Sequence, residues 1–131
     1  MKVLFWPYWN QADEGTGNLE GFLTKLKLQA KHPKLYALAK ATVRKAGDPG
    51  GLEAQRQSGY AAKLRHESDL WEFRIPPKRR GGVLRIYFCI LSKPSECIVC
   101  LDSELKKRAN SSGQKVDSAR QRLREIATWL R

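Results

Sequence analysis

Two alternating segments of the chain carry the residues best suited to chemistry. The first is Leu70–Ile75 and the second is Val83–Ile90, with a basic turn between them. Side chains of a strand point alternately to its two faces, so Arg74 and Arg85 project away from the apolar side of their strands. If the strands form a hairpin, the two arginines lie opposite or nearly opposite each other. Like charges so placed disfavour a sheet, and a phosphate diester between the two guanidinium groups would relieve the repulsion.

The composition agrees with a polyanionic partner. The 131 residues carry a formal net charge of +12, and the sequence pI is near 10.0. Such a charge is typical of nucleic-acid binding, but it does not separate RNA from DNA. The length and the 41% of hydrophobic residues predict a single domain that spans residues 1–131.

Compartment and cofactors follow from what the sequence contains. No segment is long and apolar enough to cross a bilayer, and Val3–Trp9 is too short and too aromatic for a signal peptide, so we expect a cytoplasmic protein that binds no membrane. The odd cysteine count fits a reducing compartment. Cys97 and Cys100 have CxxC spacing, but residues three apart on a strand point to opposite faces and cannot share a metal. We expect buried thiols, no metal and no cofactor.

Periodicity and breakers predict the elements that must position these residues. The predicted fold is α+β, with an N-terminal strand and a helical hairpin followed by an antiparallel sheet and a C-terminal helix. In this arrangement the helices cover one face of the sheet and leave the other free for function. Trp71 and Phe73 point to the covered face, and the arginines of the last helix are expected to face solvent. The expected elements are a strand at 2–6, helices at 19–30 and 35–43, a loop at 52–60, strands at 62–65, 70–75, 83–90 and 97–101, and a helix at 116–130.

Several motifs in order resemble a known family. Leu-Trp-Glu-Phe-Arg at 70–74, Gly-Val-Leu-Arg-Ile-Tyr-Phe at 82–88, a further apolar strand and then Leu-Lys-Lys at 105–107 are similar to the RelE/ParE toxin superfamily, in particular to its HigB-like, phage-derived branch. The resemblance is strongest over residues 63–107. It implies a RelE-like fold and a toxin of a type II toxin–antitoxin system that cleaves messenger RNA, in many members on the ribosome. It also implies a metal-independent ribonuclease and a cognate antitoxin, expected to be a helix-turn-helix protein.

The resemblance also implies roles for individual residues. In this chemistry the ribose 2′-hydroxyl attacks the adjacent phosphate, and cationic groups stabilise the phosphorane. Arg85 is expected to hold the scissile phosphate and Arg74 to support it or a neighbouring phosphate. Tyr87 is expected to stack on a base or to orient the 2′-hydroxyl. Lys106 and Lys107 are expected to bind the RNA backbone or to supply transition-state charge. The other basic residues expected to contact RNA are Lys63, Lys78, Arg79, Arg80 and Arg108, and the basic turn at 78–80 fits a solvated loop tip equally well.

The general acid and base stay open, with Lys63, His66, Glu72 and Glu104 as candidates. Glu72 has a second interpretation, because beside Arg74 and facing Arg85 it can simply neutralise a guanidinium group. The chain also departs from the family at 101–105, where Asp102 and Glu104 stand at usually neutral positions.

Those two carboxylates could pair with the lysines that follow. Because one fold can carry several functions, two others compete with RNA cleavage: a ParE-like inhibitor of DNA gyrase, and a catalytically silent relative that only binds nucleic acid.

Overall fold

The computed structural model describes residues 1–6, 19–23, 26–65, 69–76, 83–92, 96–106 and 113–130. Their centre is a five-stranded sheet with the strand order β1-β5-β4-β3-β2. The edge strand β1 (Lys2–Phe5) runs parallel to β5 (Cys97–Lys106). The other neighbours pair antiparallel, and they include β4 (Val83–Leu91), β3 (Trp71–Ile75) and the short edge strand β2 (Ala61–Lys63). The α+β class is confirmed, but the sheet is mixed rather than purely antiparallel.

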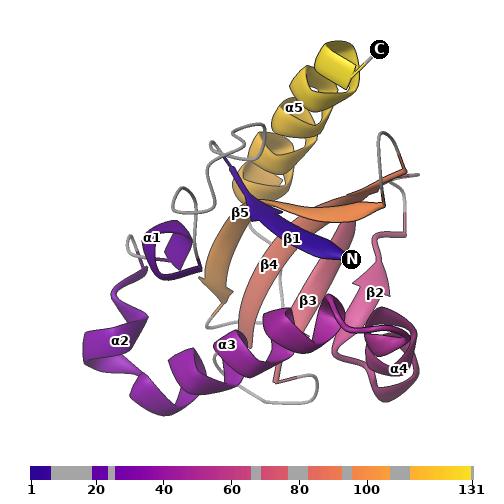
Figure 1. Ribbon diagram of the computed structural model, residues 1–131. Coiled ribbons are helices and arrows are strands. Elements are labelled where there is room, and N and C mark those ends of the chain that lie inside the picture. Colours follow the sequence, from indigo (N-terminus) through magenta and orange to yellow (C-terminus); the bar gives the residue numbers. More distant parts are fainter. Residues whose placement is uncertain are drawn as a thin grey trace.

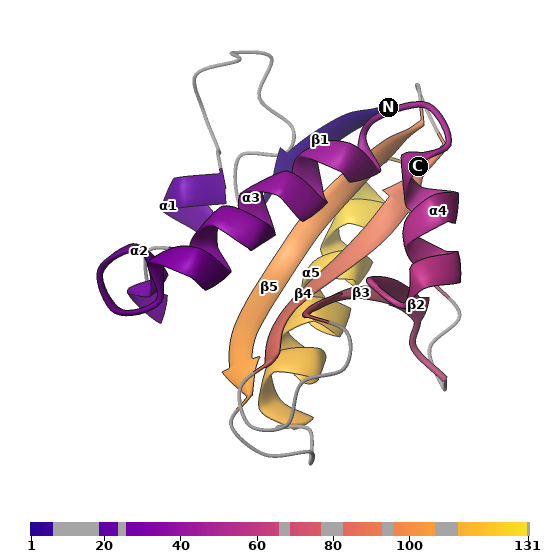
Figure 2. The same ribbon diagram turned by 90° about the horizontal axis from the view of Figure 1, so that it is seen from below.

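Helices lie on both faces of the sheet (Figure 1). On one face lie α1 (Leu19–Leu23), α2 (Leu28–Lys31), α3 (Pro33–Ala46) and α4 (Gly51–Ser58), and on the other lies α5 (Gly113–Leu130). In Figure 2, α3 crosses in front of the strands while α5 lies behind them. The prediction of a free sheet face is therefore wrong. The physical reason is that β4 and β5 carry apolar side chains on both faces, and each face needs cover.

Two hydrophobic cores result. The first joins α1–α4 to the sheet through Phe73, Phe88, Ile98 and other side chains. In it the Phe73 and Phe88 rings stack with their centroids 4.2 Å apart, and Trp71 stacks on Phe88 at 6.0 Å. The second core packs Ala119 and Ile126 of α5 against the opposite face. Cys97 and Cys100 point to opposite faces of the sheet, as the sequence predicts, because Cys97 belongs to the second core and Cys100 to the first.

The predicted second helix is confirmed as α3, whose buried stripe includes Ala39, Thr42 and Val43. The predicted helix at 19–30 is wrong as one unit. Lys27 lies between α1 and α2 with φ 53°, in the left-handed region that an α-helix cannot contain. The predicted loop at 52–60 is also wrong, because α4 occupies most of it. Only Gln55 of α4 is fully buried, and its amide donates a hydrogen bond to the Thr42 carbonyl (2.6 Å), so the helix has no apolar stripe to find.

Candidate functional site

The candidate site is built around a cross-strand arginine pair. Arg74 on β3 and Arg85 on β4 are direct partners in the sheet, as the sequence predicts. The anion between them belongs to the protein, since Glu72 of β3 is buried between both guanidinium groups. Arg74 Nε donates to Glu72 Oε1 at 2.6 Å, and Arg85 Nη1 donates to Glu72 Oε2 at 3.1 Å. Glu72 therefore neutralises not one guanidinium group but two.

The pair lies at a partly open edge of the face that α5 covers. The Arg74 side chain keeps 42% of its surface exposed and the Arg85 side chain 22%, whereas Glu72 keeps 1%. A ligand from solvent can thus reach the two guanidinium groups without first displacing the core.

Strand β5 adds a second ion pair to the same face. Glu104 is the direct partner of Arg85 in the sheet, and Lys106 is two residues further along β5. The Lys106 ammonium lies 3.7 Å from Glu104 Oε1, and both side chains are almost fully buried. The pairing expected from the acidic departure of this strand is confirmed for Lys106.

Three buried donors of this cluster lie around Glu104 without a hydrogen bond of ideal geometry, although the Glu104 carboxylate acts on both Tyr87 and Lys106. They are Arg85 Nε, the Tyr87 hydroxyl and Lys106 Nζ, none of which makes a hydrogen bond of standard length and angle to any described residue. Register places the three side chains on one sheet face around Glu104. A buried donor without a well-aligned acceptor costs about 1–3 kcal/mol, so these three groups are suited to donate to an oxygen of a ligand.

Two of these donors have pKa values that are shifted in opposite directions by their surroundings. Burial, followed by the Glu104 and Glu72 carboxylates, raises the pKa of Tyr87 well above its ordinary value of 10.0, so this phenol stays protonated. Burial, followed by the nearby Arg85 charge, lowers the pKa of Lys106 from 10.5, although Glu104 and Glu72 oppose the shift. Lys106 is therefore easier to deprotonate than a surface lysine.

Helix α5 closes the far side of the cluster through Arg122. Its guanidinium group donates to the Leu101 carbonyl, lies 3.7 Å from the Asp102 carboxylate and stacks over the Trp6 ring at 5.6 Å. The expectation that Arg122 simply faces solvent is wrong. Asp102, an acid that directly follows the apolar run Cys97–Leu101, was the signal in the sequence that a cation must come from elsewhere.

Lys63 lies outside the Arg74–Arg85 cluster. Lys63 of β2 is the cross-strand partner of Trp71, on the opposite sheet face, with its ammonium 6.0 Å from the centre of that ring. Its position in the pleat places it on the other side of the sheet from the arginine pair, so Lys63 is not part of the candidate site, and its expected RNA contact stays a prediction. Six further predicted residues lie outside the described parts of the chain: His66, Lys78, Arg79, Arg80, Lys107 and Arg108.

The cysteines take no part in the cluster. All three are buried, and burial raises the pKa of Cys89 to about 12. A thiol in that state is a poor nucleophile at neutral pH. Within the described residues no three His, Cys, Asp or Glu side chains are grouped so that they could hold a metal ion.

Comparison with known proteins gives no match: no protein-family model fits the chain, and neither a curated protein nor a solved structure is detectably similar to it. None of the described helices combines the length and the apolar character that a bilayer crossing needs. The site must therefore be interpreted from its own chemistry.

Proposed function

We propose that this protein is a metal-independent endoribonuclease, the toxin of a toxin–antitoxin pair that cuts messenger RNA, including messenger on the ribosome. The observation that carries the proposal is the group of three buried donors around Glu104, none with a hydrogen bond of ideal geometry, beside a half-open arginine pair. Arg85 and Lys106 supply charged N–H groups and Tyr87 a neutral O–H group, the set that the non-bridging oxygens of a phosphorane require.

Among the candidates that the structure describes, the geometry favours one general base, while His66 lies outside the described residues. Both oxygens of Glu72 accept guanidinium hydrogen bonds, which stabilise its charge and occupy its lone pairs. Lys63 lies on the other face. Glu104, directly across from Arg85, is the carboxylate that we assign to accept the 2′-hydroxyl proton.

The proposed reaction has one balanced step. As the proton of the 2′-hydroxyl moves to Glu104, the 2′-oxygen bonds to phosphorus, the bond from phosphorus to the 5′-oxygen breaks, and Lys106 gives that oxygen a proton. The products are a 2′,3′-cyclic phosphate and a 5′-hydroxyl. The lowered pKa of Lys106 suits this proton donation, and Arg74 at the open edge binds the neighbouring phosphate.

The first test is made in cells. The wild-type chain and an Arg74→Ala/Arg85→Ala variant are induced in parallel, and new RNA 5′ ends are mapped. Arg120→Ala/Arg124→Ala on α5 removes the same charge elsewhere and is the matched control. We expect translation-dependent cuts with the wild type and the control, and none with the site variant.

The site variant leaves the buried Glu72 without either cation, so a second variant is needed. Arg85→Lys keeps a positive charge for Glu72 but loses the Nε donor and the planar fork. We expect at least about a 100-fold loss of cleavage, the scale of losing one oxyanion donor. Equal cleavage by wild type and Arg85→Lys would contradict the assigned role.

A catalytically silent binding protein is the second candidate, and Glu72 favours it. Because its carboxylate already neutralises both arginines, these side chains could serve binding without catalysis. Arrest of growth without RNA cuts would instead indicate a protein target such as gyrase. If the wild-type chain neither arrests growth nor cuts RNA, the result supports the protein that only binds nucleic acid.

A further inference from the structure

A second strongly charged region lies far from this site. The described residues 26–47 contain six cations and no acidic side chain, so they supply +6 of the formal net charge of +12. They come from α2, α3 and the turn before α2. The six are Lys27, Lys31, Lys34, Lys40, Arg44 and Lys45.

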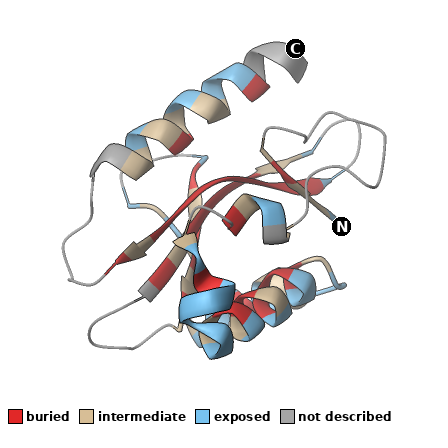
Figure 3. Ribbon diagram, turned by 90° about the vertical axis from the view of Figure 1, so that its left-hand side faces the viewer, coloured by how far each residue is buried: buried red, intermediate tan, exposed pale blue. Residues whose placement is uncertain are grey.

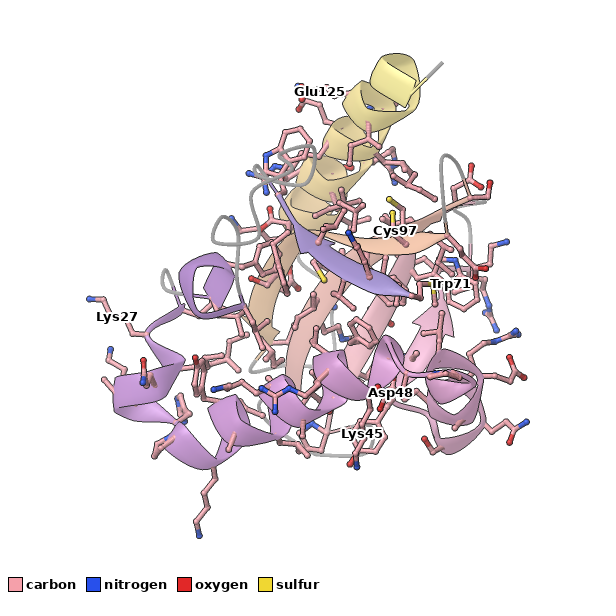
Figure 4. The ribbon with its side chains drawn as sticks, in the orientation of Figure 1. Lys27, Lys45, Asp48, Trp71, Cys97 and Glu125 are labelled. Carbon is pink, nitrogen blue, oxygen red and sulfur yellow. The ribbon has the colours of Figure 1, made fainter. Side chains whose placement is uncertain are left out.

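Five of these side chains form what we call the basic α3 surface, namely Lys27, Lys31, Lys34, Arg44 and Lys45. All five are exposed. Figure 3 shows the buried side of α3 against the sheet and its exposed side turned outward, and Figure 4 shows Lys27 directed away from the molecule. The left-handed backbone of Lys27 places it in a turn outside the helices.

The middle of this surface is one face of helix α3. Lys34 and Lys45 are eleven residues apart on one helix, which corresponds to about 16 Å at 1.5 Å per residue. Between them the exposed positions are Arg44 and two alanines, Ala37 and Ala41, whose methyl groups allow another molecule to approach the helix closely. The helix thus sets the spacing of the backbone positions that carry these charges.

The side chains present favour double-helical over single-stranded nucleic acid. Sequence-tolerant binding of single strands needs exposed aromatic rings on which bases stack. On α3 the one aromatic residue is Tyr36, which is 8% exposed, and Lys40 lies 5.9 Å from the centre of its ring. Contacts to a regular phosphate backbone need only fixed cations, and a double helix offers the highest density of phosphates.

We propose that the basic α3 surface binds the phosphate backbone of double-helical nucleic acid, independently of base sequence. It lies on the opposite side of the sheet from the Arg74–Arg85 cluster (Figure 1). The proposal therefore goes beyond RNA cleavage and does not rest on it. A molecule with both sites could hold a duplex on one side while the other meets a single strand.

The test measures binding to labelled duplexes of RNA and of DNA, and to the matching single strands, by fluorescence anisotropy over a series of salt concentrations. Five phosphate contacts predict a slope of log K against log salt of about −4.5. Lys34→Glu/Lys45→Glu should weaken duplex binding at least about tenfold and reduce that slope by about 2. Lys34→Gln/Lys45→Gln, which removes the two charges without reversing them, should weaken duplex binding by a smaller factor.

The matched control is Lys115→Glu/Arg124→Glu on α5, which changes the net charge equally on the other side of the sheet. It should weaken duplex binding much less. The RNA and DNA arms show which duplex supplies the phosphates, and tighter binding of either one than of its single strand supports the proposal. Equal losses in the two charge-reversal variants, stronger binding of single strands, or no duplex binding by the wild type would overturn it. A failure of RNA cleavage would leave all these readings unchanged.

Discussion

Glu72 decides how the residues of the site are interpreted. The alternating pattern of β3 and β4 predicts which side chains share a face, and the direct pairing of Arg74 with Arg85 is confirmed. The same pattern leaves Glu72 with two roles. Only the structure shows its carboxylate between both arginines, since that position depends on rotamers and burial. Burial of Lys106 was likewise unpredictable from its strand, because it depends on cover from elsewhere.

The pH dependence of stability tests the environment of Lys106. Because its pKa is lowered in the folded protein, the unfolded chain binds more protons just below the ordinary lysine pKa of about 10.4, and stability gained from this group rises with pH there. Lys106→Met cannot titrate. Urea unfolding between about pH 7 and pH 10 should show the wild type gaining stability relative to Lys106→Met.

Comparing the two proteins at each pH cancels the contribution of the buried thiols, which both contain. A stability difference that stays constant over this interval would mean that Lys106 titrates as a solvated lysine.

Among the elements, those with an apolar stripe or an alternating pattern could be predicted, and those with neither could not. The stripe of α3 and the alternation of β3 and β4 identify them correctly. Helix α4 was not predicted because its buried residue is Gln55. The break at Lys27 was not predicted because no proline or glycine marks it. The position of α5 was missed for another reason. The apolar run Tyr87–Ile90 in β4 indicates burial on both faces, a signal that the predicted free face overlooked.

Arg122 should contribute most of the polar attachment of α5 to the sheet. Arg122→Ala loses the bond to the Leu101 carbonyl, the pair with the buried Asp102 and the stacking on Trp6. We expect a loss of about 1–3 kcal/mol in the free energy of unfolding, measured with urea. The control Arg120→Ala breaks an exposed pair with Asp117 on the same helix and should cost less than about 1 kcal/mol. Equal costs for the two variants would contradict the attachment.

At the scale of the whole molecule, one sheet serves two cores and separates two charged regions. The Arg74–Arg85 cluster holds nearly balanced charges, with four cations against three carboxylates once Lys106, Arg122 and their acidic partners are counted. The basic α3 surface carries its charge without any acid. In our two proposals, attraction of a polyanion and recognition of one phosphate therefore belong to different sides of the protein.

Because the strands are shared by both cores, the described parts should unfold together. Trp71 packs against the first core and Trp6 against the second. Far-UV circular dichroism and tryptophan fluorescence should therefore give coincident urea transitions. An earlier change in one signal would mean that α5 leaves the sheet before the rest unfolds.

The most direct test of the central claim is the chemistry of the cut end. Purified protein is given one messenger RNA, free and on programmed ribosomes, and the new 3′ ends are analysed. We predict 2′,3′-cyclic phosphate ends in at least the ribosome-bound messenger, with at least about a 100-fold slower reaction for Arg85→Lys and for Glu104→Gln. No cleavage of either messenger, or cleavage by both variants at the wild-type rate, would contradict the account.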